Sequence, residues 1–311
     1  MSGAGEPRLA VVVPVRNAAD VVPAFLQSLE GSTYPDWTAF LADDKSTDDT
    51  PLVVARWCEL TGHGRLIRLR DRLGPPGARN AALRAALAEG HSLIVFHDAD
   101  CVVEPATLAG HTAAHAAHPR TGIIGGPVRS LHRTPIGAAD GYASWFTSPP
   151  GRPSGRVRFL HLPTCNLSVK SWVFERTGLF REDLATGEDV AFCQEARRHG
   201  IEIRFEARAT VGHHDRDDLT SALAHHERWG AHTHDVRQGR GAFLGGAVPR
   251  DPRVCRVVEV PYAVAFTLLV LGLWIWYDPR VLLATKSIYR MKRAFTRGMV
   301  AGARRRARDQ S

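Results

Sequence analysis

Short apolar runs alternate with longer stretches of helical periodicity through the first hundred residues, and this alternation constrains the fold more than any other feature of the chain. The first run is Leu9–Val13, and similar runs follow at Thr38–Ala42, Leu66–Leu69 and Leu93–Phe96. Runs without a polar face predict strands that are covered on both sides, as in a parallel sheet. The chain is therefore expected to have an α/β fold, with a mostly parallel sheet and helices on both faces.

Between these runs, apolar residues recur at helical spacing. We expect helices at Ala18–Leu29, at Thr50–Leu60 with Asp48 or Asp49 as its cap, and at Ala78–Glu89. The second half is less regular and predicts strands at Gly122–Val128, Glu202–Phe205 and Ala209–Gly212, with helices at Phe192–His199 and Leu219–Gly230. Residues 134–160 contain many Gly, Pro and Ser and predict a mobile loop. His111 and His115 have metal-ligand spacing but no third ligand, so we expect them on a solvated helix face.

Acidic side chains follow two of the predicted strands, at the edge where a parallel sheet binds its ligands. The second strand leads into Asp43–Thr50, and the fourth leads into His97–Asp100. The first leads into Pro14–Asn17, which lacks the GxGxxG pattern of a dinucleotide-binding fold. Carboxylates gathered at one edge repel one another unless a cation lies among them, and Asp-x-Asp suits Mg²⁺ or Mn²⁺. These segments therefore predict a divalent-metal site beside a ligand that contains phosphate.

With these motifs the chain resembles glycosyltransferase family 2, whose members have the Rossmann-like GT-A fold. The resemblance covers roughly residues 8–235 and rests on the order and spacing of Pro14–Asn17, Asp43–Thr50, Gly77–Asn80, His97–Asp100 and Gly187–Asp189. It implies a nucleotide-sugar donor that is UDP-, GDP- or dTDP-linked, and Mn²⁺ or Mg²⁺ as cofactor. One departure is Lys45, where the family more often has Gly.

The resemblance also implies a role for each matching residue. The donor nucleotide would be bound by Pro14, Val15, Asn17, Asp44, Arg79 and Asp98. The metal would be held by Asp98, Asp100 and His213. Asp189 would be the catalytic base, with Glu188 beside it to raise its pKa or orient the acceptor. The acceptor or the diphosphate would be contacted by Asn166, Arg228 and Trp229, the last two from a motif similar to that of processive synthases.

The C-terminal part has a different character. Val260–Tyr277 is uncharged for 18 residues, close to the roughly 20 that cross a bilayer, and the excess of a net charge of +8 gathers in Arg280–Arg308. Basic residues on both sides argue against a simple span, so we expect a re-entrant hairpin or a helix lying in the cytosolic leaflet, with a buried soluble helix as the alternative. We expect a catalytic domain over residues 1–250, and a membrane-associated apolar helix with a basic amphipathic tail over residues 251–311.

Composition bears on the partners and the compartment. The basic tail has few interleaved aromatic residues, which favours lipid headgroups over nucleic acid. The five cysteines are scattered without a CxxC pair, which argues against a disulfide framework or a structural zinc site and fits a reducing compartment. The N-terminus lacks a basic region followed by an apolar run, so we expect no signal peptide, and both termini on the cytoplasmic face of the cell membrane.

Together these features predict an inverting glycosyltransferase of cell-envelope polysaccharide synthesis. It would move a sugar from a nucleotide-sugar donor to a glycan, glycolipid or other hydroxyl acceptor at the membrane. One alternative is a polyprenyl-phosphate sugar transferase. An alternative of another class is a membrane-tethered module that binds sugar nucleotides without catalysis.

Overall fold

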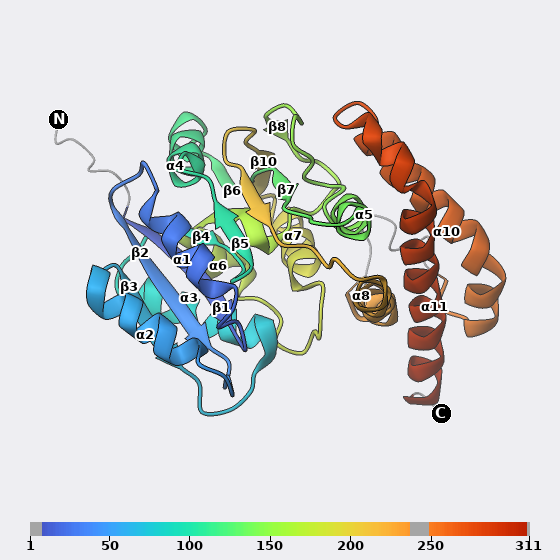
Figure 1. Ribbon diagram of the computed structural model, residues 1–311, viewed down its shortest axis with the longest axis horizontal. Coiled ribbons are helices and arrows are strands. Elements are labelled where there is room, and N and C mark those ends of the chain that lie inside the picture. The colour runs from blue at the N-terminus through green and yellow to red at the C-terminus, as the bar shows by residue number, and fades with distance from the viewer. Residues whose placement is uncertain (1–7, 237–248, 310–311) are drawn as a thin grey trace.

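The computed structural model describes residues 8–236 and 249–309. Its centre is an eight-stranded sheet in the order β3-β2-β1-β4-β9-β6-β10-β8 (Figure 1). The strands are β1 (Leu9–Val15), β2 (Trp37–Asp43), β3 (Gly64–Arg68), β4 (Leu93–Phe96), β6 (Thr121–Gly125), β8 (Gly155–Arg156), β9 (Leu167–Lys170) and β10 (Glu202–Phe205). β3, β2, β1 and β4 pair in parallel, as do β6 and β10, while β9 is antiparallel to β4 and β6. This confirms the predicted fold class.

Helices cover both faces of the sheet. Successive residues of β1 point to opposite faces, and both sets of side chains are apolar and buried. Val11 and Val13 belong to one buried core, and Ala10 and Val12 to the other. The helices against the sheet are α1 (Val22–Glu30), α2 (Thr50–Thr61), α3 (Gly74–Ala88), α4 (Thr107–Ala117), α6 (Ser171–Thr177) and α7 (Glu188–Arg198). The first core takes in side chains of α1 and α2, and the second takes in those of α3 and α7.

A second, three-stranded sheet lies beside the first and was only partly foreseen. The strand expected over residues 122–128 divides, because β6 ends at Gly125 and a separate strand, β7 (Val128–Ser130), follows. β7 pairs with β11 (Val211–His213), which also pairs with β5 (Cys101–Val103). This small sheet joins β5, which follows β4 closely in the sequence, to β11, which comes much later.

Residues 134–160 are not a continuous loop, which corrects the prediction from their composition. They contain α5 (Pro135–Ser144), whose N-cap Thr134 accepts a hydrogen bond from the Gly137 amide at 3.1 Å. Asp217 accepts further hydrogen bonds from the Thr134 amide and hydroxyl. The helix packs against the C-terminal part of the chain. Its stability therefore comes from distant partners that a count of Gly, Pro and Ser does not register.

The prediction that His111 and His115 are solvated was wrong. Both are buried under α4, where the two nitrogens of His111 lie 2.9 Å from the Asn166 Oδ1 and the Ser168 Oγ. His115 Nε2 lies 2.9 Å from the same Ser168 hydroxyl. Burial lowers the pKa of His111 to about 4 and that of His115 to about 3, so both rings are neutral. The spacing that resembles metal ligation instead fastens α4 to the sheet.

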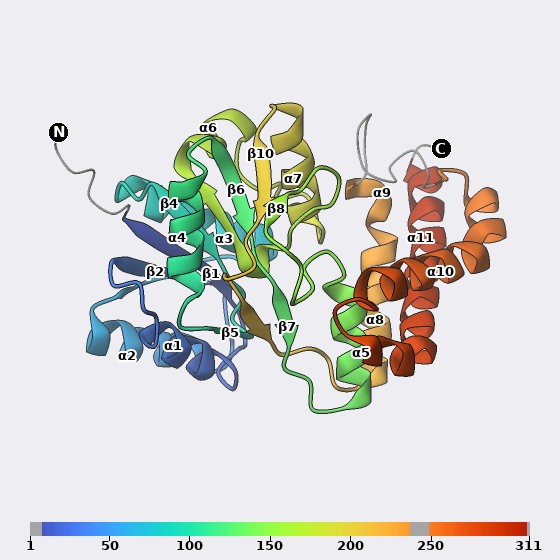
Figure 2. The same cartoon turned by 90° about the horizontal axis from the view of Figure 1, so that it is seen from above.

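The C-terminal helices gather at one end of the molecule (Figures 1 and 2). They are α8 (Leu219–Ala231), α9 (Thr233–Val236), α10 (Pro252–Trp274), the 3-10 helix η3 (Pro279–Ala284) and α11 (Thr285–Asp309). α11 packs on α8 and on α10. The predictions about the N-terminus and the extreme C-terminus fall on residues 1–7 and 310–311, and the residues just before the predicted domain boundary are 237–248. All three segments lie outside the described residues.

Three glycines allow α11 and α8 to touch backbone to backbone. A Cβ on Gly298 would lie 1.9 Å from the Glu227 carbonyl oxygen, and one on Gly230 would lie 1.8 Å from the Phe295 carbonyl oxygen. A Cβ on Gly302 would lie 2.2 Å from the Ala231 carbonyl oxygen. Because the obstructing atoms belong to the main chain, no rotamer change can relieve these clashes. We call these three residues the glycine clamp.

The glycine clamp gives a stability prediction. Gly298→Ala should force α11 away from α8 and lower the free energy of unfolding by about 1–3 kcal/mol, the usual cost of overpacking. Gly272→Ala is the matched control, because this helical glycine has nothing within 4 Å of the added Cβ. That substitution should raise stability by up to about 1 kcal/mol through helix propensity. Urea unfolding of both variants measures the difference, and equal effects of the two would contradict the clamp.

Candidate active site

A cavity of about 680 Å³ lies at the carboxyl ends of β1, β2 and β4. It is lined by nearly all of the predicted site residues: Pro14, Val15, Asn17, Asp44, Arg79, Asp98, Asp100, Glu188, Asp189, His213, Arg228 and Trp229. Asn166 is not among the lining residues. It is fully buried, and its amide nitrogen donates to the carbonyl oxygens of Pro127 and Ala209. The structure therefore gathers all the other predicted site residues and leaves Asn166 in the core.

Arg79 joins the segment that contains Asp98 to the segment that contains Glu188. Its guanidinium is buried and donates to Glu188 Oε1 at 2.6 Å and to Asp98 Oδ1 at 3.0 Å. Arg79 comes from α3, Asp98 follows β4, and Glu188 begins α7, so one side chain joins three elements. The resemblance placed Arg79 at the nucleotide. That role stays a prediction, and the structure adds that its two ion pairs bridge the Asp-x-Asp segment and the Glu-Asp segment.

Glu188 and Asp189 stand in the first turn of α7, where the helix dipole favours negative charge. Gly187 just before them has a φ of 78°, and a Cβ there would lie 2.8 Å from Val236 Cγ2. Removal from solvent raises the pKa of Asp189 to about 7, and the charge of Glu188 adds to the rise. Burial also raises the pKa of Asp98, although Arg79 opposes this. Asp189 thus has the proton affinity that suits a general base near neutral pH.

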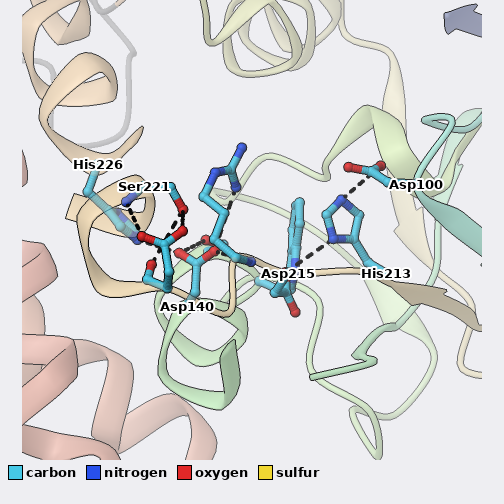
Figure 3. Close-up of polar contacts among 10 residues, drawn as sticks. Asp100, Asp140, His213, Asp215, Ser221 and His226 are labelled. Atoms are coloured by element: carbon cyan, nitrogen blue, oxygen red, sulfur yellow. Dashed lines mark hydrogen bonds and ion pairs between the residues drawn. The ribbon is translucent and has the colours of Figure 1, made fainter. Parts of the chain in front are cut away.

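His213 lies beside Asp100 because β11 pairs with β5 in a register that sets His213 opposite Cys101. Its Nε2 is 3.3 Å from Asp100 Oδ1, and its Nδ1 is 3.1 Å from Asp215 Oδ1 (Figure 3). Asp215 also accepts a hydrogen bond from Trp145 Nε1 at 2.7 Å. A carboxylate on the far nitrogen of a histidine fixes the ring, as is usual behind metal-binding histidines.

Asp100, Cys101 and His213 form a group that could hold a metal ion, with one ligand atom from each within 4.8 Å of the others. Asp100 Oδ1 is buried, and among the described residues its one side-chain partner is the His213 ring at 3.3 Å, so it keeps lone pairs that a cation could take. Burial acts to raise the pKa of Asp100, but His213 outweighs it and lowers that pKa. The residues present therefore fit a divalent metal. Asp98, predicted as a further ligand, lies outside this group and pairs with Arg79, and its metal role stays a prediction.

The donor side of the cavity is shaped by two residues with left-handed backbone. Asn17 has a φ of 45° and accepts from the Thr47 amide at 2.8 Å, which ties the end of β1 to the loop after β2. Lys45 has a φ of 59°, so it adopts a conformation that glycine enters more easily. The family departure at Lys45 thus keeps the turn. Asp44 accepts from the amides of Leu73 and Gly74 at 2.6 and 3.0 Å.

Several cavity residues were not found from the sequence. Trp145 packs on His213, with ring centroids 4.6 Å apart, and comes from the segment predicted as a loop. Lys292 of α11 is buried, lines the cavity and donates to the Ala143 carbonyl oxygen at 2.8 Å. Burial lowers the pKa of Lys292 to about 8. Its helical spacing from the apolar Ile288 and Phe295 was the available signal, because it sets Lys292 on the inner face.

A second buried polar pair lies away from the metal-binding group (Figure 3). Asp140 of α5 and His226 of α8 are both buried, with Oδ1 and Nε2 3.0 Å apart. Asp140 Oδ2 also accepts from the Arg216 amide at 3.1 Å. Burial lowers the pKa of His226 to about 4, so the pair is a hydrogen bond that positions α8 beside the cavity.

The fold is of the GT-A type, as a solved structure of that fold shows. The model of "Glycosyl transferase family 2" matches residues 10–168, slightly more than half of the chain, and the chain belongs to that family.

Known relatives and structures agree with this assignment. Glycosyltransferase AglE of Haloferax volcanii is 26% identical over 212 residues, which are 67% of this chain and 67% of AglE. The pre-mycofactocin glycosyltransferase of Mycobacterium tuberculosis is 25% identical over 79% of this chain, which spans about half (48%) of that relative. Mannosyltransferase PcManGT of Pyrobaculum calidifontis, solved with GDP-Man and Mn²⁺, has a TM-score of 0.63 at 20% identity, covering 94% of this chain and 88% of PcManGT. S. aureus TarS 1-349 with UDP-GlcNAc has a TM-score of 0.53 at 15% identity, over 96% and 92%.

The Arg79 bridge gives the prediction for this site. Arg79→Met would leave Asp98 and Glu188 without their shared cation, and the free energy of unfolding should fall by about 3–5 kcal/mol. Arg79→Lys keeps a charge that cannot reach both carboxylates, so it should fold and lose kcat/KM. The matched control is Arg84→Met on the same helix, whose ion pair with Glu182 is exposed and worth at most about 1 kcal/mol. An Arg79→Lys enzyme with unchanged kcat/KM would contradict the positioning role.

Proposed function

We propose that this chain is an inverting glycosyltransferase that moves a sugar from a nucleoside diphosphate sugar to an acceptor hydroxyl. The observation that carries the proposal is the bridge made by Arg79. It sets Asp189, through its neighbour Glu188, on the same cavity as Asp98 and Asp100. A carboxylate suited to accept a proton thus shares one site with a group suited to a metal and a diphosphate.

The donor would lie across the ends of β1, β2 and β4. Pro14, Val15, Asn17 and Asp44 would contact the base, and Asp98 the ribose. Solved relatives of the same fold hold GDP-Man, UDP or UDP-GlcNAc. This supports a UDP-, GDP- or dTDP-linked donor here.

Asp100 and His213 would hold the divalent cation, Mn²⁺ or Mg²⁺. When bound, such an ion neutralises the charge of the departing nucleoside diphosphate. Arg228, which lines the same cavity, would offer that diphosphate a second cation. Trp229 would stack on a sugar ring.

Catalysis would be a single displacement. The acceptor oxygen forms a bond to the anomeric carbon while the bond from that carbon to the diphosphate oxygen breaks, and its electron pair leaves with the nucleoside diphosphate. The Asp189 carboxylate takes the hydroxyl proton. Glu188, held by Arg79, keeps the electrostatic environment that raises the pKa of Asp189. One displacement inverts the configuration at the anomeric carbon.

The acceptor would be a glycan, a glycolipid or another hydroxyl compound of the cell envelope. The name of one relative supports this class: the putative teichuronic acid biosynthesis glycosyltransferase TuaG of Bacillus subtilis, 27% identical over 95 residues. A polyprenyl phosphate is the second candidate acceptor. Apolar side chains from α10 and α11 line one side of the cavity and favour a substrate with a hydrocarbon part: Phe266, Leu269, Val270 and Phe295.

The proposed location is the cytoplasmic face of the cell membrane. Among the described residues, one helix, Pro252–Trp274, has the length and composition to cross a membrane. Only 22% of its most apolar 18-residue stretch is buried inside the protein. We propose residues 1–250 as the catalytic domain and residues 251–311 as the part that meets the membrane while also walling the cavity.

The base can be tested by pH and by an isosteric change. Because Asp189 acts as the unprotonated carboxylate, kcat/KM should rise with pH through about 7 and level off above it. Asp189→Asn should remove this limb and lower kcat by roughly 10²–10⁴, while donor binding survives. Glu195→Gln, an exposed acid on the same helix, is the control and should behave like the unmodified enzyme. A wild-type pH profile in Asp189→Asn would assign the base elsewhere.

The metal role has its own test. Asp100→Ala should abolish transfer and weaken Mn²⁺ binding measured by calorimetry, with the fold retained, because the Asp100 side chain is 41% exposed. The control is Glu104→Gln, an exposed acid whose pair with Arg129 lies outside the cavity. Transfer by Asp100→Ala that persists in EDTA would refute a metal at this position.

A further inference from the structure

Exposed apolar side chains are concentrated in α10 and in the segment that follows it. Of the fourteen large apolar side chains that are exposed in the described residues, ten lie between Val254 and Leu283. Along α10 they follow helical spacing, and they continue into the segment after it: Val254, Val257, Val260, Val264, Leu268, Ile275, Trp276, Tyr277, Leu282 and Leu283. We call these ten residues the outer face. Soluble proteins rarely leave so continuous an apolar surface without a partner.

The opposite side of α10 is fixed to the protein. Cys255 packs with Val300 and Ala303, and the Phe266 ring lies 5.6 Å from the Phe295 ring. Glu259 accepts from Arg293 at 2.6 Å, which forms an ion pair between α10 and α11. These contacts extend along most of α10, so α10 and α11 form an antiparallel pair.

α11 is in turn held on the catalytic part of the chain by the glycine clamp. This packing limits the orientations in which α10 can contact a bilayer. With 23 residues α10 is about 35 Å long, enough to cross. Crossing would carry the paired α11 into hydrocarbon with Arg290, Arg293 and Arg297, and each such charge is costly there. Leaving α11 behind would strip away the contacts of the inner side. Only an orientation along the membrane surface keeps both.

Basic residues surround the outer face. Arg253 and Arg256 are exposed at its start, and Lys286 and Arg290 are exposed after its end. Residues 252–309 hold twelve basic and three acidic side chains. Two of those acids, Glu259 and Asp278, are paired with Arg293 and Arg280. An apolar strip with cations around it matches the acyl chains and anionic headgroups of a single leaflet.

We infer that α10 lies in the plane of the membrane, with the outer face seated in one leaflet of an anionic bilayer, and does not span it. This rests on the proposed membrane location and makes it specific. Because Phe266, Leu269 and Val270 of the same helix line the catalytic cavity, α10 separates the cavity from the acyl chains by the width of one helix. A lipid-linked acceptor would then need to rise only a short way from the leaflet.

Flotation with vesicles tests the seat. The full chain should float with vesicles of mixed phosphatidylcholine and phosphatidylglycerol, and much less with phosphatidylcholine alone. Leu268→Glu with Leu283→Glu should reduce the bound fraction about tenfold or more, because two exposed leucines that would enter the bilayer are replaced by charged side chains. The matched control is Leu52→Glu with Leu60→Glu on α2. These two leucines are similarly exposed but do not belong to the outer face. Equal loss in both double variants would overturn the proposal.

The depth of three spin labels separates a seat from a span. Cysteines placed at Val257, Val264 and Ile275, in a Cys58→Ser background, should report one shallow depth from their relative accessibility to oxygen and to a nickel complex. A graded depth, greatest at Val264, would show a span. Failure to bind vesicles, together with a dimer in sedimentation, would assign the outer face to a second copy.

Donor binding on the same proteins keeps this inference distinct from the proposed function. The Leu268→Glu, Leu283→Glu variant should show the same thermal shift with Mn²⁺ and nucleoside diphosphates as the unmodified chain. If no nucleotide binds to either protein while flotation behaves as expected, the transferase proposal fails and the seat stands. If nucleotides bind and flotation does not depend on the outer face, the seat fails alone.

Discussion

The buried guanidinium of Arg79 is the interaction on which the site depends. A cation with so little exposure is stable only if it is paired, and its two partners belong to segments that are about ninety residues apart. Folding therefore cannot bury Arg79 without bringing the end of β4 to the start of α7. The same bridge sets the charge around Asp189, since Glu188 is one of its ends. The bridge thus fixes the position of these acids, whereas the raised pKa of Asp189 comes first from its burial and then from the charge of Glu188.

Local physics made much of this predictable from the sequence. β4 is bounded as expected because a strand that is buried on both faces needs an unbroken apolar run, and the acids after it follow at the ligand edge. α5, Trp145 and the core roles of His111 and His115 escaped because they depend on long-range packing, which leaves no periodic signal nearby. The Asn166 prediction followed a position in the chain, whereas its amide is consumed by the Pro127 and Ala209 carbonyls.

The metal-binding group shows how a small sheet can serve chemistry. β5 follows directly on the Asp-x-Asp segment, and β11 arrives from more than a hundred residues later. Their pairing decides that His213, and not His214, faces Asp100. Asp215 then fixes the ring from behind. The Cys101 sulfur, within 4.8 Å of both proposed ligand atoms, adds a soft donor that a hard oxygen site does not require, so the choice of ion depends on whether its thiol takes part.

The glycine clamp also sets an angle. Advancing α11 by a single residue on α8 would turn it by about 100° about its own axis. Lys292 would leave the cavity, and the buried Met291 and Ala294 would turn away from their packing partners. Main-chain contact at three glycines forbids that rotation more strictly than side-chain packing does, because no rotamer can absorb it. The three glycines therefore fix the rotation of α11 about its own axis, and with it the choice of side chains that α11 presents to the cavity.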